Sequence, residues 1–76
     1  MNNYIDVEIC PTDENIIVAE IEGYCIQCSL HEEQNLSHKE CVDQFRTAVN
    51  ICGLDEDSIK NHMRINNIDC EIEIYK

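Results

Sequence analysis

Two pairs of side chains that commonly bind metals lie within the 17 residues of segment 25–41. The first pair is Cys25 and Cys28, and the second is His38 and Cys41, with His31 between the pairs. Thiolates and an imidazole in two close pairs are the ligands that a tetrahedral zinc ion requires. The spacing therefore predicts a zinc site formed by Cys25, Cys28, His38 and Cys41, with His31 as a substitute ligand.

The second pair lies where a helix is expected to begin. Ser37 can act as the N-cap, and Glu40, three residues later, completes a capping box. His38 and Cys41 would then share one face of the first helical turn. A Cys-x-x-Cys turn followed by a His-x-x-Cys helix start resembles a short treble-clef or zinc-knuckle arrangement. This resemblance implies a structural zinc ion.

Two other uses of the six cysteines remain open. Cysteine is among the most frequently buried residue types, and Cys41 also lies on an apolar helix stripe, so these thiols can be reduced core residues. Alternatively, Cys25 and Cys28 can form a disulfide or a redox-active pair. Cys52 and Cys70 fall at apolar positions, and we expect them to be buried rather than to bind a metal.

Strict alternation of apolar and acidic residues predicts strands at 4–10 and 68–75, and the segment 16–22 predicts a third. Residues 29–36 are expected to form a loop, unless 24–30 forms a further short strand. An apolar stripe predicts a helix at 38–52 that ends at Gly53. A second helix is expected from Asp55, its N-cap, to about residue 65.

These elements predict one small α+β domain that spans residues 1–76. Its antiparallel sheet has three strands, or four if 24–30 is a strand, and carries one main and one short helix on one face. The predicted order is ββ(zinc loop)ααβ. At 76 residues, such a domain is near the lower size limit for folding on a hydrophobic core alone.

The net charge is −11, and residues 1–38 contain no Lys or Arg. Direct binding to nucleic acid needs a cationic surface, so this function is not expected. The N-terminus has neither the basic start nor the apolar segment of a signal peptide, and no apolar run is long enough to span a membrane. We therefore expect a reduced, cytoplasmic protein.

The predicted strands place many carboxylates and no basic residue on their outward positions. If these strands are adjacent, the carboxylates form a planar array that imitates the charges of a phosphate backbone. Such a surface would bind a basic groove on a nucleic-acid-handling enzyme. The alternative is a solvated acidic face without a partner. The predicted binding residues are Asp6, Glu8, Glu20, Glu22, Asp69, Glu71 and Glu73.

Catalytic motifs are not evident. The two glycines, 30 residues apart, cannot form a phosphate-binding loop, and a chain of this size leaves little room for a closed substrate pocket. We therefore expect an interaction protein rather than an enzyme. In its size, acidity and lack of catalytic residues, the chain resembles the small inhibitors that phages make against host nucleic-acid enzymes, such as anti-CRISPR and anti-restriction proteins. The rival hypothesis is a zinc-binding or thiol-redox protein that uses Cys25 and Cys28.

A second resemblance concerns Gly23-Tyr24-Cys25 and the helix at 40–49 that follows. These features resemble HicB-type antitoxin domains, which have a β-β-β-α-β order. The Gly-Cys-x-x-x-Gly-x-Thr run of that family is not present in this chain. This resemblance implies a protein that binds and neutralises a toxin.

Overall fold

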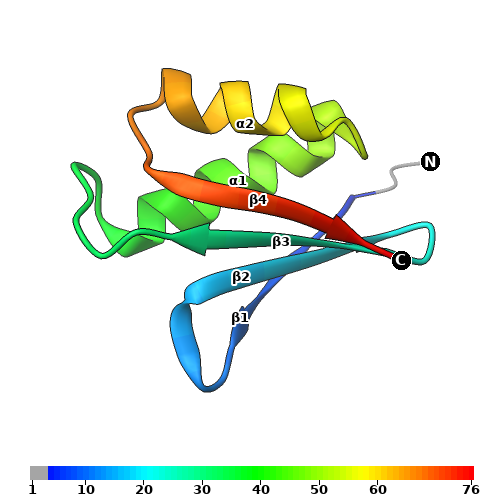
Figure 1. Ribbon diagram of the computed structural model, residues 1–76, viewed down its shortest axis with the longest axis horizontal. Helices are drawn as coiled ribbons and strands as arrows, with labels where there is room; N and C mark the ends of the chain where they lie inside the picture. Colours follow the sequence, from blue (N-terminus) through cyan, green and yellow to red (C-terminus); the bar gives the residue numbers. More distant parts are fainter. Residues whose placement is uncertain (1–3) are drawn as a thin grey trace.

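The computed structural model describes residues 4–76 and contains one sheet covered by two helices on one side (Figure 1). In chain order, the elements are β1 (Val7–Cys10), β2 (Asp13–Ile21), β3 (Tyr24–Leu30), α1 (His38–Cys52), α2 (Glu56–Ile65) and β4 (Cys70–Tyr75). The α+β class is confirmed, with the sheet in its four-stranded form. The segment 24–30, for which a further short strand was one of the expected alternatives, forms β3.

The four strands lie in the order β1-β2-β3-β4, and every neighbouring pair is antiparallel. The chain returns from α2 to form β4 beside β3, so that β1 and β4 are the two edges of an open sheet. In this order one strand separates β4 from β2, and two strands separate it from β1. This order is the main feature of the fold that determines where charged side chains lie.

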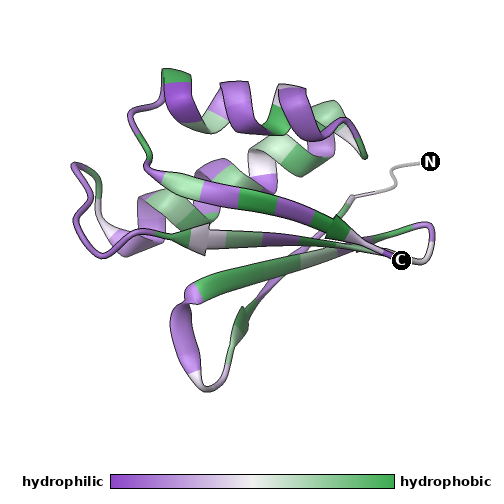
Figure 2. Ribbon diagram, in the orientation of Figure 1, coloured by the Kyte–Doolittle hydropathy of each residue, from purple (hydrophilic) through white to green (hydrophobic). Residues whose placement is uncertain are grey.

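The core lies between the sheet and the helices. Along β4, apolar and acidic residues alternate, and Figure 2 shows this alternation as successive green and purple segments. The apolar side chains point to the helices, where Phe45 of α1 and Ile59 of α2 are completely buried. The buried residues are Ile17, Ala19, Ile26, Cys28, Leu30, Cys41, Val42, Phe45, Ala48, Val49, Ile59, Met63, Ile68 and Ile72.

Both helices begin with the predicted caps. The Ser37 hydroxyl accepts a hydrogen bond from the Glu40 amide, and the Asp55 carboxylate accepts one from the Ser58 amide. These bonds satisfy amide groups that have no partner within the first turn of a helix. Gly53, with a φ of 63°, ends α1 as expected.

The hairpin between β2 and β3 explains why the segment after Gly23 is a strand. Ile21 pairs with Tyr24, so that Glu22 and Gly23 form a two-residue turn with φ values of 50° and 84°. Positive φ at both turn residues is typical of a type I′ hairpin, whose twist matches that of its strands. The chain therefore continues directly into β3 rather than into a metal-binding turn.

No helix within residues 4–76 is long and apolar enough to cross a membrane.

Candidate functional site: the open face of the sheet

The strand conformation of β3 separates the first pair of predicted zinc ligands. Successive side chains of a strand point to opposite faces, so residues three apart, such as Cys25 and Cys28, lie on different sides of the sheet. Cys28 is completely buried under the helices, whereas Cys25 is half-buried on the opposite face. At roughly 3.3 Å per residue, their Cα atoms are about 10 Å apart, too far for a disulfide.

The second pair of predicted ligands, His38 and Cys41, does not form one cluster with Cys25 and Cys28. Cys41 is completely buried in the core, whereas His38 is half-buried and its Nε2 contacts the Glu14 carbonyl oxygen. Within the described part of the chain, no group of three His, Cys, Asp or Glu side chains is arranged to hold a metal ion. Zinc binding by the four residues stays a prediction, and it would require β3 to rearrange.

Three thiols instead lie near one another in the core. The thiols of Cys28 and Cys70 lie near enough to affect one another's titration, and Cys41 lies close to both. The interaction with the Cys70 thiol, together with burial, raises the pKa of the Cys28 thiol well above its ordinary value. Burial likewise raises the pKa of Cys41. Cys28 and Cys41 are therefore neutral packing residues near pH 7, and they are weak nucleophiles. Cys70 was expected to be buried but is only half-buried, and its interaction with the Cys28 thiol lowers its pKa.

The other side of the sheet is not covered by any element of residues 4–76. One row of directly paired residues crosses all four strands on this open face: Glu8, Val18, Gln27 and Glu73. The register places six further residues on the same face, and the whole set is Glu8, Ile16, Val18, Glu20, Cys25, Gln27, Ser29, Glu71, Glu73 and Tyr75.

Carboxylates occupy both sides of this open face, but they do not form one continuous array. Glu8 and Glu20 come from β1 and β2, whereas Glu71 and Glu73 come from β4. The expectation that the acidic strands are adjacent is wrong, because β3 lies between β2 and β4. Across three strand spacings of about 4.8 Å, Glu8 and Glu73 are roughly 14 Å apart.

Three of the seven predicted binding residues, Asp6, Glu22 and Asp69, lie outside the strands that form this acidic face. Asp6 pairs with Arg46 of α1 at 3.0 Å. The amide of Val7 and the Arg46 guanidinium hold the pKa of Asp6 below its usual value. Glu22 lies at the tip of the β2–β3 hairpin. Asp69 precedes β4; its amide and carbonyl bond to the Gln34 side chain, and its carbonyl also accepts a hydrogen bond from the His31 amide.

The basic side chains lie on the helices and at the chain end, away from the open face. Lys39 pairs with Asp43, and Lys60 pairs with Glu56. Lys76 lies over the ring of Tyr24, with Nζ 5.2 Å from the ring centroid. Of the four glutamates on the open face, the described residues give an ion-pair partner only to Glu71, whose Oε2 is 3.7 Å from His31 Nε2.

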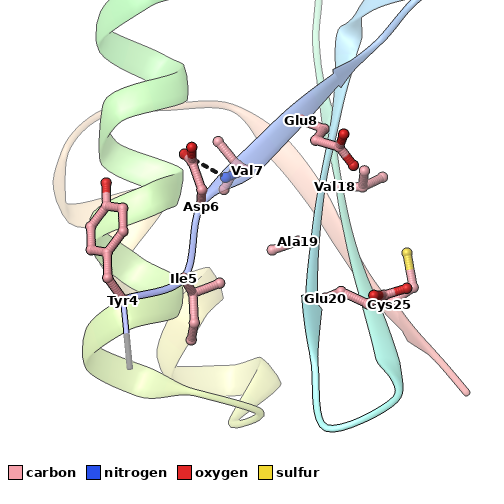
Figure 3. Close-up of a pocket in the computed structure, with 9 residues that line it drawn as sticks. All are labelled: Tyr4, Ile5, Asp6, Val7, Glu8, Val18, Ala19, Glu20 and Cys25. Atoms are coloured by element: carbon pink, nitrogen blue, oxygen red, sulfur yellow. Dashed lines mark hydrogen bonds between the residues drawn. The ribbon is translucent and has the colours of Figure 1, made fainter. Parts of the chain in front are cut away.

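The neutral centre of the open face was missed by sequence reasoning. Figure 3 shows part of it, with Glu8 beside Val18 and Glu20 beside Cys25, next to a shallow hollow along β1 and β2. Once 24–30 is recognised as a strand, its alternation would have placed Gln27 and Ser29 there. The apolar residues Ile16, Val18 and the thiol of Cys25 lie between the two groups of glutamates.

Comparison of the chain with family models, curated proteins and solved structures gave no significant match.

Proposed function

We propose that this chain is a non-enzymatic interaction protein whose open sheet face binds a basic site on a nucleic-acid-handling partner. One observation carries the proposal: four glutamates flank the uncovered face of the sheet, and no Lys or Arg of residues 4–76 is paired with them. An uncompensated charge of one sign destabilises a compact domain through self-repulsion. A basic partner removes that repulsion when it binds.

The separation of the two acidic groups supports imitation of a nucleic acid. About 14 Å lie between Glu8 and Glu73 across the sheet, which is comparable to the width of about 12 Å of the major groove in B-DNA. A basic cleft that holds two phosphate strands can therefore contact both groups of glutamates at once. The neutral residues between them, such as Val18 and Gln27, allow close approach without burying a charge.

The proposed role is that of a small cytoplasmic inhibitor, comparable in type to the anti-CRISPR and anti-restriction proteins. Occupying a basic site blocks nucleic-acid binding without any chemical reaction, so the inhibitor needs no catalytic residue. Complementary charge would mainly accelerate association and make it sensitive to salt.

Displacement by nucleic acid tests this function. The purified protein, immobilised through its N-terminus, captures its partner from a host lysate at low salt. Duplex DNA and single-stranded RNA, added at the same ionic strength as a salt control, are then used for elution. Elution by a nucleic acid but not by the matched salt is the expected result. A captured protein that only salt elutes would contradict nucleic-acid imitation.

An antitoxin is the second candidate function, and one observation favours it. With β3, the chain has a β-β-β-α-α-β order, which is closer to the β-β-β-α-β order of HicB-type antitoxin domains than the predicted order was. In this role the partner is a toxin protein. Co-expression with the captured partner distinguishes the candidates, because only a toxin would arrest host growth when it is expressed alone.

A further inference from the structure

We infer that β4 is a docking edge, to which the partner adds an extended segment with alternating basic and apolar side chains. This inference goes beyond the proposed function, because it concerns the main chain at the edge of the sheet rather than the charges on its face. Strand addition of this type gains affinity from main-chain hydrogen bonds and specificity from alternate side chains.

The main chain of β4 has a free side. The His31 amide donates a hydrogen bond to the Asp69 carbonyl, and this pair continues the β3–β4 register. In an antiparallel pair, hydrogen-bonded residues alternate with residues whose main chain points away. The N–H and C=O groups of Cys70, Ile72 and Ile74 therefore point away from β3, and no hydrogen bond within residues 4–76 uses them.

By contrast, the opposite edge of the sheet, at β1, is protected from pairing with another strand. Asn50 of α1 bonds to both the amide and the carbonyl of Ile5, just before β1. The Asp6 carboxylate accepts a hydrogen bond from the Val7 amide, and the register shifts between Ile9 and Cys10. Edge strands usually carry such bulges, caps, lysines or prolines, which prevent unwanted pairing. β4 has none of these features.

A groove lies beside this edge on the helix side. It is formed between α2 and the start of β4, and its lining includes Asn61, Arg64, Ile68 and Cys70. In an added strand, every second side chain would point to the helix side of the sheet, next to the core-facing side chains of β4 with which it is paired. The groove therefore offers space for one small apolar side chain of the added strand, at the position beside Cys70 and Ile68.

Charge determines which occupant fits the edge. On the open face, an added antiparallel strand places its remaining side chains directly opposite Glu71 and Glu73. Lysine or arginine at these positions forms favourable cross-strand pairs. A second copy of this chain, paired through its own β4, would bring its glutamates against these, which is destabilising. A basic partner strand is therefore favoured over a dimer.

N-methylated peptides test strand addition. The probe is a short synthetic peptide with alternating lysine and valine, because an added strand would point its valines to the groove and its lysines to Glu71 and Glu73. In this arrangement only the valine amides face β4. N-methylation of the valines should weaken binding by more than about tenfold. N-methylation of the lysines, which leaves the charge the same, should change it by less than roughly threefold.

A pair of variants provides the matching test on the protein. Proline at an edge position whose amide faces solvent is compatible with a strand. Ile74→Pro therefore removes one outward amide, whereas Ile74→Ala removes the same side chain and keeps that amide. We expect only the proline variant to weaken binding of the unmodified peptide.

Three results would overturn the inference: equal binding of the three peptides, no binding of the unmodified peptide, or a concentration-dependent dimer that is lost in Ile74→Pro. Equal binding of the peptides would leave the proposed function intact, since it would show that charge alone holds them. Conversely, the proposed function fails if nucleic acid does not displace the captured partner, whatever the pattern of N-methylation.

Discussion

The six cysteines have very different surroundings, and these differences determine their chemistry. Cys28 and Cys41 have no exposed surface, whereas Cys10 lies partly exposed at the end of β1. The Cys10 Sγ is 3.3 Å from the Thr12 hydroxyl oxygen. Hydrogen bonding from Thr12 lowers the pKa of the Cys10 thiol. A larger thiolate fraction makes an accessible cysteine more reactive.

We expect Cys10 to react first with a thiol-specific reagent at pH 7 in the native protein, and Cys28 and Cys41 to react last. Thr12→Ala removes the hydrogen bond and should slow modification of Cys10 by roughly threefold, and Thr12→Ser should restore the rate. Mass spectrometry after brief labelling measures the order. Equally rapid labelling of Cys28 would show that the core thiols are not packed as described.

The buried thiols also explain why the zinc site could not be judged from the sequence. The ligand types and spacing of Cys25, Cys28, His38 and Cys41 fit a metal as well as they fit a strand followed by a capped helix. A metal site and a strand differ in the face of the sheet on which each side chain lies. In β3, Cys28 acts as a small apolar residue, so the alternation of Ile26, Cys28 and Leu30 is a strand pattern.

Among the elements, β1, β2, β4 and both helices follow directly from local sequence patterns. Alternation and capping are local signals, so they could be recognised without tertiary information. The position of β4 beside β3 could not be recognised in this way, because it depends on how the chain returns from α2 to the sheet. For this reason the sequence did not show that Glu8 and Glu73 lie at opposite edges of the sheet.

The hydrogen bonds between Asn50 and Ile5, at the β1 edge of the sheet, give a prediction about stability. Asn50→Ala leaves the amide and carbonyl of Ile5 without their partners, and should lower the free energy of unfolding by about 1 kcal/mol. Thr47→Ala is the matched control, because the Thr47 hydroxyl bonds only to a carbonyl of its own helix. It should change stability by less than about 0.5 kcal/mol. Urea denaturation measures both.

Hydrogen exchange gives the local readout for the same pair of variants. The Ile5 amide should exchange faster in Asn50→Ala than in the parent, while the amides of β4 keep their rates. Unchanged protection of Ile5 in Asn50→Ala would mean that Asn50 does not protect this edge.

At the scale of the whole molecule, the two sides of the layer differ in charge balance. The helix side carries ion pairs such as Lys39–Asp43 and Arg46–Asp6. The open face carries Glu8, Glu20, Glu71 and Glu73 without a basic residue between them. A net charge of −11 is thus distributed so that one face attracts a cationic surface.

Association kinetics can show whether this acidic open face makes the partner contact. The double variant Glu8→Lys/Glu71→Lys reverses one charge at each side of the face. Glu32→Lys/Glu33→Lys makes the same change in net charge within the loop that follows β3. The association rate constant of each variant with the captured partner is measured over a range of salt concentrations.

We expect the face variant to associate more than about tenfold more slowly at low salt, and its association rate to depend less on salt. The loop variant should be affected less, because Glu32 and Glu33 lie outside the four strands whose side chains form the open face. Equal rates for the two double variants, or a rate that does not depend on salt, would contradict the claim that the open face binds the partner.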